Sequence, residues 1–511
     1  MSQIQLAHLG FCYEGSPDAV FEDVSVVLDS TWRLGLIGRN GRGKTTLLRL
    51  LAGELTGHTG RILSSVDFDY FPFSLADTEL AAHEAVASAR PQVEAWQIAR
   101  ELAALGISED VLYVPYCYLS PGEQAKVQLA ALFAHEGRFL AIDEPTNHLD
   151  EVARRQVSAY LSSKQGFILV SHDRRFLDNC IDHVMSINRT TIEVQSGNFS
   201  SWWENSQRRE QFERERDAKL RKEVRRLAQA ASRTASWSAS IESSKIGSGP
   251  VDRGFVGHQS AKMAKRAKTV ERRRDVALEE RTQLLRDAEE KDDLRISPLR
   301  HHAERLVGFD EVTVRYGCSQ VSGPVTFELL RGDRIAVRGA NGTGKTSVLL
   351  LLLQQLGVGC EQGARIPPML NADGSIHTAS QLRVSYVSQQ TGHLRGSLSE
   401  LARAAGAEES YYFALLRKLG FERAQLKCDV SELSGGLRKK ALIARSLCEQ
   451  SHLYVWDEPL NYLDMPARMQ VEDLLIEGRP SMLFIEHDSA FRERVATKEL
   501  VIGSAGSRAC D

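Results

Sequence analysis

The chain of 511 residues is 42% hydrophobic and 26% charged, a composition that fits a globular protein of about three domains. No apolar run approaches the roughly 18 residues that a membrane-spanning helix requires, and no basic stretch followed by an apolar core opens the chain, so we expect neither a membrane segment nor a signal peptide. The eight cysteines form no Cys-x-x-Cys pair, which argues against a zinc or disulfide framework and favours a cytoplasmic location.

Charge is distributed unevenly along the chain, whose net charge is −3. Residues 201–300 carry 24 Lys and Arg against 17 Asp and Glu, and within them residues 219–274 carry 15 against 4. The remainder of the chain is therefore acidic, while its middle is basic. This contrast predicts that the middle segment meets a polyanionic partner.

A glycine-rich loop follows the first apolar strand pattern, WRLGLIG. The loop, GRNGRGKTT, matches the P-loop pattern G-x-x-x-x-G-K-[ST], and TTLLRLLAG predicts a helix directly after it. Backbone N–H groups at such a helix N-terminus bind phosphates, the lysine neutralises phosphate charge, and the first hydroxyl binds Mg²⁺. The phosphate-binding residues predicted here are Gly38, Asn40, Gly41, Gly43, Lys44, Thr45 and Thr46, with Thr45 also a metal ligand.

Three more motifs follow in the first half. LSPGEQAK predicts a helix that begins with the Ser120 hydroxyl and the Gly122 amide, a group suited to hold a γ-phosphate. In FLAIDEPTNHLD an apolar strand ends in Asp143, predicted to lie near Mg²⁺, and in Glu144, predicted to orient or deprotonate the attacking water. His172, in LVSHD after the next strand, is expected to contact the γ-phosphate and hold that water in line.

The basic middle of the chain predicts two long helices, 205–235 and 260–290, that are rich in helix formers and contain no proline. The proline between them, Pro250, lies in GSGPVDRGFVG, so we expect a helical hairpin linker over 201–302 with its tip near 239–258. Basic residues and one aromatic residue near the tip suit phosphate contacts and base stacking, which predicts a ribosome- or tRNA-binding set of Arg253, Phe255, Lys262, Lys265, Arg266 and Lys268. The alternative is a solvated coiled-coil spacer.

The second half repeats the motifs of the first half in the same order and at nearly constant spacing, which indicates a tandem duplication. GANGTGKTS repeats the P-loop, LSGGLRKK the Ser-Gly helix start, LYVWDEPLNYLD the paired carboxylates and FIEHD the histidine. The second set of phosphate-binding residues is Gly339, Asn341, Gly342, Gly344, Lys345, Thr346 and Ser347, with Thr346 also a metal ligand. The remaining repeated residues are Ser434, Gly435 and Gly436 for phosphate, Asp457 for Mg²⁺, and Glu458 and His487 for catalysis.

Together these motifs resemble the ATP-binding cassette (ABC) superfamily. The resemblance implies an α/β fold with two P-loop ABC ATPase domains in tandem, 1–200 and 303–511, joined by the α-helical hairpin. It implies a monomer whose two domains close on each other as a sandwich. In that arrangement Ser434, Gly435 and Gly436 complete the ATP site at Lys44, and Ser120 and Gly122 complete the site at Lys345. By the same resemblance, Tyr13 and Tyr316 stack on adenine, and Gln389 contacts Mg²⁺.

Two residues of the first half depart from the ABC pattern. Pro121 replaces the first glycine of the Ser-Gly motif and has no N–H to offer a phosphate, so we expect a weaker grip there. Phe73, in YFPF, stands where the second half has Gln389, and an aromatic ring cannot ligate a metal. We therefore expect the site at Lys44 to hydrolyse ATP slowly or differently.

Two ABC domains around a basic hairpin resemble the ABC-F family, and the chain is most similar to its Lsa-type antibiotic-resistance branch. LGLIGRNGRGKTTLLRLL, GFILVSHDR, WDEPLNYLD, IEHD and SAKMAKRAK carry this similarity. It implies an ATP hydrolase, dependent on ATP and Mg²⁺, that binds the exit site of the 70S ribosome and contacts rRNA and peptidyl-tRNA. It also implies release of antibiotics from the peptidyl transferase centre, namely lincosamides, streptogramins A and pleuromutilins.

Three other functions compete with ribosome protection. A housekeeping ABC-F translation factor acting on stalled ribosomes would share every motif up to the hairpin tip. The cytosolic ATPase of a drug exporter would need a membrane partner and would have no use for a basic hairpin. A DNA-bound structural ATPase would also use basic helices, although its coiled coil would normally be longer.

Overall fold

The computed structural model describes residues 3–15, 19–135, 137–146, 149–188, 191–243, 296–317, 319–340, 342–359, 363–461, 463–503 and 507–510, with Lys262, Lys265, Lys268, Thr269, Arg272, Arg273, Asp275 and Val276. The chain forms two compact units. The larger comprises Met1–Ile187, Ile192–Phe199 and Lys291–Asp511, and the smaller comprises Asn188–Thr191 and Ser200–Glu290. Among the described residues, no helix is long and apolar enough to cross a membrane. The domain boundaries expected at 200 and 302 stay predictions.

The first half of the larger unit contains two sheets. A small antiparallel sheet has the order β2 (Ala19–Asp29), β1 (Gln3–Cys12), β4 (Thr59–Ser64). The other sheet has the order β5 (Asp67–Phe71), β6 (Arg138–Asp143), β7 (Phe167–Val170), β3 (Arg33–Gly38), β8 (His183–Ile187), β9 (Ile192–Ser196). It is parallel except for β9. Because parallel strands end at one edge, the loops after β3, β6 and β7 come together there.

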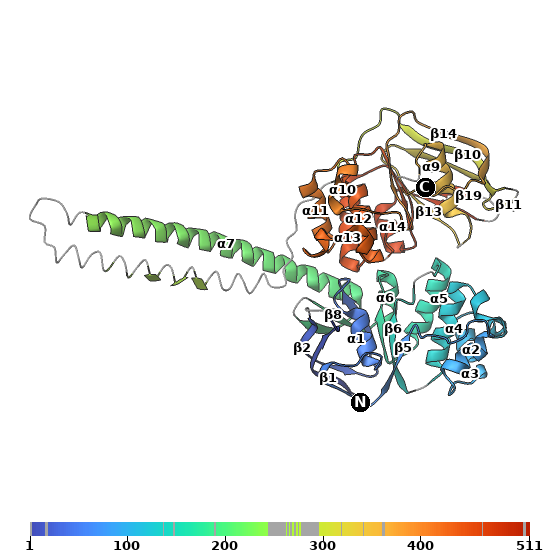
Figure 1. Cartoon of the computed structure of the whole chain (residues 1–511), viewed down its shortest axis with the longest axis horizontal. Helices are drawn as coiled ribbons and strands as arrows, with labels where there is room; N and C mark the ends of the chain where they lie inside the picture. Colours follow the sequence, from blue (N-terminus) through green and yellow to red (C-terminus); the bar gives the residue numbers. More distant parts are fainter. Residues whose placement is uncertain are drawn as a thin grey trace, which may run out of the picture. The chain divides into compact units, whose positions relative to one another are not determined.

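Helices cover and extend the sheets of the first half. They are α1 (Lys44–Leu51), α2 (Ala82–Ala89), α3 (Ala95–Ala104), α4 (Pro121–Phe133), α5 (Glu151–Ser162) and α6 (Arg174–Cys180). In this half, Figure 1 shows α2, α3 and α4 gathered at one end, with β1 and β2 at the other. The half therefore has a mainly helical end, which begins after β5, and a mainly β-stranded end.

The second half repeats this plan in a single mixed sheet. Its order is β11 (Ser319–Gln320), β10 (Arg305–Tyr316), β12 (Val325–Leu330), β19 (Ser507–Cys510), β18 (Lys498–Val501), β13 (Arg334–Arg338), β17 (Met482–Ile485), β16 (Leu453–Asp457), β15 (Val384–Val387), with β14 (Leu370–Thr378) paired to β10. Strand β19 joins the antiparallel strands β10, β11, β12 and β14 to the rest of the sheet, because it pairs with both β12 and β18. The parallel strands are apolar and buried, as the fully buried side chains of Tyr454 and Trp456 show.

The helices of the second half correspond to those of the first. They are α9 (Lys345–Gln355), α10 (Leu398–Ala404), α11 (Glu409–Lys418), α12 (Gly435–Cys448), α13 (Met465–Gly478) and α14 (Ser489–Val495). The isolated bridge between Ser397 and Asp429, ahead of α10, matches the bridge between Ala81 and Pro115 in the first half. This correspondence allows positions of the two halves to be compared one by one.

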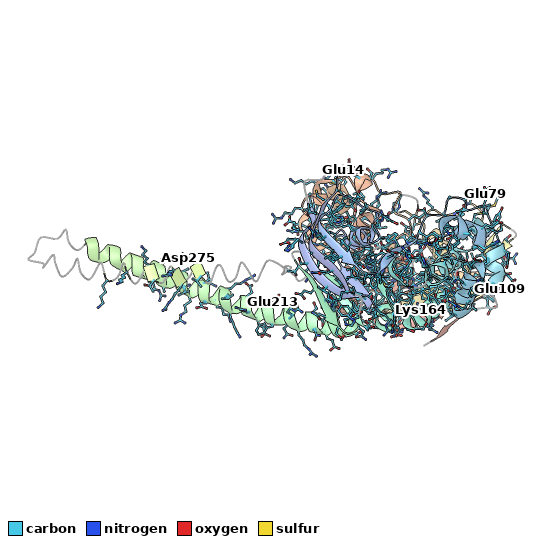
Figure 2. The ribbon with its side chains drawn as sticks, turned by 90° about the horizontal axis from the view of Figure 1, so that it is seen from below. Glu14, Glu79, Glu109, Lys164, Glu213 and Asp275 are labelled. Atoms are coloured by element: carbon cyan, nitrogen blue, oxygen red, sulfur yellow. The ribbon has the colours of Figure 1, made fainter. Side chains whose placement is uncertain are left out.

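Apart from its first residue, the long helix α7, Phe199–Ser243, belongs to the smaller unit. Figure 2 shows charged side chains such as Glu213 along it. Beyond Phe199, the described side chains of α7 that are buried are those of Asp217 and Leu220, and Asp217 pairs with Arg221 at 2.6 Å. The described part of the helix reaches Ser243, which lies within the range 239–258 expected for the tip. The described residues between 262 and 276 are helical.

Candidate nucleotide sites

The two glycine-rich loops have the same conformation. Each leads into its helix through a glycine in the left-handed region, Gly43 with φ 86° and Gly344 with φ 85°, a conformation that other residues adopt only with strain. At Gly43 an added Cβ would also lie 2.5 Å from Val20 Cγ1. These glycines point the first N–H groups of α1 and α9 into the loops, as phosphate binding requires.

The two P-loop lysines curl back over their own loops. Lys44 Nζ donates to the carbonyl oxygens of Gly38 (2.8 Å) and Arg39 (3.2 Å), and Lys345 Nζ donates to those of Gly339 (2.9 Å) and Ala340 (2.8 Å). Burial lowers the pKa of both ammonium groups, while nearby carboxylates oppose the shift. Both halves thus present an ammonium group and aligned N–H groups at one point, an arrangement that suits polyphosphate.

In both halves the P-loop hydroxyl meets the aspartate at the end of the neighbouring strand. Thr45 Oγ1 donates to Asp143 Oδ2 at 2.6 Å, and Thr346 Oγ1 lies 3.4 Å from Asp457 Oδ1. Hydroxyl and carboxylate oxygens are hard donors of the kind that Mg²⁺ prefers. The residues present therefore fit the predicted metal ion.

In the second half, Glu458 is surrounded by donors. Its Oε2 accepts from Gln389 Nε2 at 2.8 Å and Asn461 Nδ2 at 2.7 Å, and His487 Nε2 lies 3.5 Å from its Oε1. Burial on its own would raise the pKa of this carboxyl group. The hydrogen bonds from the imidazole and the two amides outweigh burial and lower the pKa to about 2. Gln389 uses its NH₂ group here, so its carbonyl oxygen stays available to a metal ion.

The equivalent carboxyl group in the first half has a different environment. His172 Nε2 lies 3.2 Å from Glu144 Oε1, while burial and the neighbouring Asp143 raise the pKa of Glu144 to about 7. Strand register shows that Phe73 and Gln389 are equivalent. The last residue of β5 pairs with the residue before Asp143, and the last residue of β15 pairs with the residue before Asp457. Phe73 and Gln389 each come two residues after these strand ends. The Phe73 ring lies 4.9 Å from the Arg90 guanidinium, and it cannot donate a hydrogen bond to Glu144.

A cavity of about 780 Å³ joins motifs from both halves. The first half contributes Ser120, Pro121 and Gly122 to its lining. The second half contributes Gly342, Gly344, Lys345, Thr346, Ser347, Gln389, Glu458 and His487. The structure therefore brings together residues that are more than 200 positions apart in the chain, in the combination that the ABC resemblance implies.

At the other P-loop, the halves meet through the loop after β16. Asp464 Oδ2 accepts from the Asn40 backbone N–H at 3.0 Å and from Lys440 Nζ at 2.9 Å. Arg468, on α13, donates to the His172 carbonyl oxygen at 2.9 Å. Ser434, Gly435 and Gly436 begin α12, the helix that carries Lys440. Sequence reasoning missed Asp464, Lys440 and Arg468, although Asp464 ends the repeated motif LYVWDEPLNYLD.

At the Ser-Gly helix start of the first half, the Glu123 carboxylate lies beside the Ser120 hydroxyl. Ser120 and Glu123 form a capping box, in which Ser120 Oγ donates to Glu123 Oε2 at 2.7 Å. The S-x-x-E spacing could have revealed this pair. Pro121 occupies the first turn of α4, where a missing N–H breaks no intrahelical hydrogen bond. The departure at Pro121 thus leaves the helix intact.

The predicted adenine-stacking tyrosines are placed in the same way in both halves. The hydroxyl of Tyr13 shares a hydrogen bond of 2.9 Å with Thr46 Oγ1, and that of Tyr316 shares one of 3.0 Å with Ser347 Oγ. Each tyrosine is thereby held beside its P-loop. Asn341, Arg253, Phe255 and Arg266, which sequence reasoning also singled out, lie outside the described residues.

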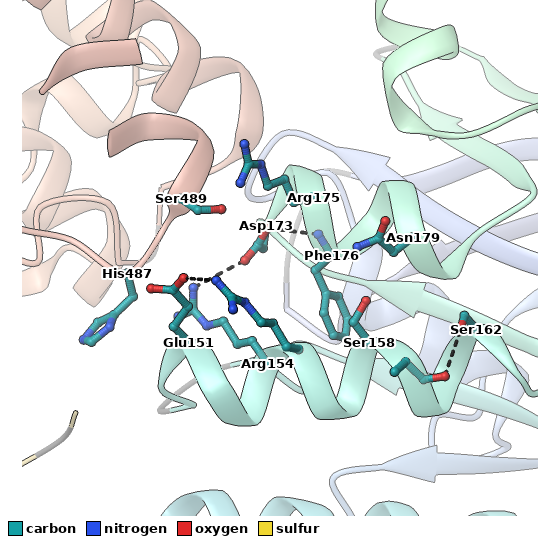
Figure 3. Close-up of a pocket in the computed structure, with 12 residues that line it drawn as sticks. Glu151, Arg154, Ser158, Ser162, Asp173, Arg175, Phe176, Asn179, His487 and Ser489 are labelled. Atoms are coloured by element: carbon teal, nitrogen blue, oxygen red, sulfur yellow. Dashed lines mark hydrogen bonds and ion pairs between the residues drawn. The ribbon is translucent and has the colours of Figure 1, made fainter. Parts of the chain in front are cut away.

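A second cavity, of about 540 Å³, is lined in part by His487 of the second half. Figure 3 shows Glu151 and Arg154 on α5 and Asp173 before α6, with His487 and Ser489 from the second half. Glu151 Oε2 accepts from Arg338 (2.9 Å) and Arg492 (3.0 Å) of the second half. The arginines that the first half contributes to the lining are also paired, Arg154 with Asp173, Arg155 with Glu151 and Arg175 with Glu493, so ion pairs border the cavity.

Two P-loop sheets in one chain, the second of which shares a cavity with the Ser-Gly helix start of the first half, define a tandem ABC ATPase. The profile of the ABC transporter family matches residues 21–147 and 323–461. The ribosome protection protein VmlR of Bacillus subtilis is 27% identical over 97% of this chain and 86% of its own length. The ATP-binding protein Uup of Caulobacter vibrioides is 30% identical over 95% of this chain and 75% of its own length.

Solved structures show the same fold. The archaeal ribosome recycling factor aABCE1, in complex with the stalk protein aP1, superimposes with a TM-score of 0.60 at 19% identity, over 98% of this chain and 89% of that one. The protein described as RNase-L Inhibitor gives 0.57 at 18% identity, over 96% of this chain and 87% of that one. The chain therefore belongs to the ABC transporter family, within its ABC-F branch, and is an enzyme that binds and hydrolyses ATP.

Proposed function

We propose that the chain is an ATP-dependent ribosome-protection factor. In this proposal it binds the exit site of the 70S ribosome in the cytoplasm, contacts rRNA and peptidyl-tRNA through its linker, and promotes release of antibiotics from the peptidyl transferase centre. Its drugs are lincosamides, streptogramins A and pleuromutilins. The alternative is a housekeeping ABC-F factor that acts on stalled ribosomes, and the 27% identity to a ribosome protection protein over 97% of the chain favours the first function.

The observation that carries the proposal is the cavity shared by Ser120 and Lys345. A triphosphate held by the second P-loop would reach the Ser-Gly helix start of the first half. Binding energy gained only when both halves touch the same nucleotide favours the closed conformation. ATP binding would therefore close the monomer as a sandwich, and hydrolysis would open it, which makes ribosome binding depend on the nucleotide state.

The residues of the second half have roles that follow from their contacts. Lys345 and the N-terminus of α9 bind the β- and γ-phosphates, and Glu458 accepts a hydrogen bond or a proton from the attacking water. Gln389 and Asn461 hold that carboxylate, and His487 holds the water in line. Mg²⁺, held by Thr346, Asp457 and the Gln389 carbonyl oxygen, would neutralise phosphate charge during transfer. The corresponding roles in the first half belong to Lys44, Thr45, Asp143, Glu144 and His172. Position 73 holds phenylalanine there, so this position offers no amide to the carboxylate of Glu144.

The linker supplies the polyanion-binding surface in this proposal. Between residues 262 and 276, the structure describes five basic residues of the linker that are helical and have exposed side chains, namely Lys262, Lys265, Lys268, Arg272 and Arg273. Exposed basic residues along one segment attract nucleic-acid phosphates independently of sequence. The net charge of residues 219–274, 15 basic against 4 acidic residues, supports rRNA or tRNA as the partner.

Drug susceptibility tests the proposal directly. A sensitive bacterium expressing the chain should become resistant to lincosamides, streptogramins A and pleuromutilins while staying sensitive to macrolides. The matched control is the Lys44→Ala, Lys345→Ala variant, which loses both phosphate-binding ammonium groups and should give no resistance at equal expression. If the parent chain pellets with ribosomes yet changes no susceptibility, the housekeeping function replaces the proposed one.

A further inference from the structure

The helical end of the first half exposes a group of apolar side chains. Tyr118 is 80% exposed, Tyr113 66%, Leu80 38% and Val114 37%. Their backbone segments lie close together because the Ala82 N–H donates to the Val114 carbonyl oxygen, the Tyr116 N–H to that of Leu80 and the Tyr118 N–H to that of Pro115. The Tyr113 ring also lies 5.3 Å from that of His83. We call Leu80, Tyr113, Val114 and Tyr118 the aromatic surface. Large exposed apolar groups that cluster in this way mark interaction sites.

The second half lacks this surface although its backbone is the same there. The Val430 N–H donates to the Gly396 carbonyl oxygen, as that of Tyr116 does to Leu80. Gly396 is therefore the equivalent of Leu80. By the same alignment of the two halves, the equivalents of Tyr113, Val114 and Tyr118 are Lys427, Cys428 and Glu432. The fold itself does not require apolar side chains at these positions, so folding does not explain them.

Acidic residues surround the aromatic surface. Asp77, Glu79, Glu84, Glu109 and Asp110 are exposed, and Figure 2 shows Glu79 and Glu109 at the same end of the first half. Residues 74–118 contain seven acidic residues and two basic ones, whereas the equivalent residues 390–432 contain six of each. Both basic residues are in ion pairs, Arg90 with Asp69 and Arg100 with Glu101. The field at this surface therefore repels phosphates and attracts cations.

We propose that the aromatic surface is a docking site for a lysine- or arginine-bearing segment of a ribosomal protein. Tyrosine faces attract guanidinium and ammonium groups, and the carboxylates around them pair with the same groups. RNA is disfavoured because its phosphates would meet the acidic residues. This docking site rests on the proposed ribosome binding. It would give the factor a second contact on the ribosome, of charge opposite to that of the linker.

Photocrosslinking of the full chain on ribosomes tests the docking site. The photoreactive residue p-benzoylphenylalanine replaces Tyr118 in one sample and Glu432, its counterpart in the second half, in a matched sample. After pelleting with ribosomes and ATP, position 118 should crosslink to a ribosomal protein at a lysine- or arginine-rich segment, and position 432 should not crosslink to that segment. A crosslink from position 118 to rRNA, or no crosslink from a pelleted sample, overturns the docking site alone. A chain that does not pellet overturns both this inference and the proposed function.

A pair of substitutions measures the contribution of the surface. Tyr113→Ser with Tyr118→Ser should weaken ribosome binding about tenfold, since exposed aromatic residues at an interface are typical energetic anchors. ATP hydrolysis without ribosomes should not change, because both side chains are exposed and lie outside the ATP sites. The control is Leu63→Ser, which removes an apolar side chain 51% exposed on β4 and should leave binding unchanged. Equal binding by the double variant and the parent would overturn the proposal.

Discussion

Replacing Gln389 with alanine should separate the activities of the two ATP sites. The substitution removes the 2.8 Å hydrogen bond that Gln389 donates to Glu458 and leaves the one from Asn461. A hydrogen bond to a charged group contributes about 1.5–3 kcal/mol, which corresponds to a loss of roughly 10- to 150-fold in turnover at the Lys345 site if the bond positions the carboxylate for the attacking water. Loss of the carbonyl oxygen proposed to bind Mg²⁺ would add to this effect. The matched variant is Phe73→Ala, because Phe73 is the residue of the first half equivalent to Gln389 by strand register and its ring donates no hydrogen bond.

Steady-state phosphate release at saturating ATP measures this difference. Gln389→Ala should reduce the rate of phosphate release to the rate that the site at Lys44 sustains. Phe73→Ala should leave the rate within about twofold of the parent. It removes only the contact of the Phe73 ring with the Arg90 guanidinium, which contributes about 0.5–1 kcal/mol. Glu458→Gln should reduce the rate as much as Gln389→Ala or more, and Glu144→Gln should reduce it less. If Phe73→Ala were as impaired as Gln389→Ala, or Glu144→Gln as impaired as Glu458→Gln, the amide at position 389 would not be what distinguishes the sites.

Three further outcomes are expected. Glu144→Gln with Glu458→Gln should hold ATP in the closed form and raise the fraction of protein that pellets with ribosomes; pelleting equal to that of the parent would contradict the nucleotide-dependent cycle. Asp464→Ala should lower the free energy of unfolding by about 3–5 kcal/mol, seen as a lower Tm, because it leaves the Lys440 ammonium buried without its partner. Asp150→Ala, its counterpart, loses a helix cap of about 1 kcal/mol, while Lys126 keeps its bond to Gln156, so equal losses of Tm would contradict this reasoning. Tyr316→Ala should raise the ATP concentration for half-maximal rate about 5- to 100-fold through lost base stacking, whereas Tyr316→Phe should resemble the parent; a Phe variant as weak as the Ala variant would assign the effect to the Ser347 hydrogen bond.

Residues close together in the chain could be assigned from the sequence because local geometry dictates them. Gly43 and Gly344 favour glycine since their φ angles are positive and an added Cβ would lie within 3.0 Å of a valine side chain, and each precedes the lysine that opens a helix. The strand ending in Asp457 reads as an apolar run because helices bury both faces of a parallel sheet. The same reasoning found the long first helix of the linker, because a run of helix-forming residues without proline is a local feature of the chain.

The sequence by itself determined that two phosphate-binding loops exist and which side chains accompany each, because motif spacing follows from strand, loop and helix lengths. Only the tertiary structure decided how those side chains are used. Glu458 is held by two amides, whereas Phe73 rests on Arg90 and leaves Glu144 with His172. Asp464 reaches Asn40 across the two halves, and the aromatic surface stays exposed in one half alone. These differences depend on burial and on contacts between residues far apart in the chain, and neither quantity is encoded in the local pattern.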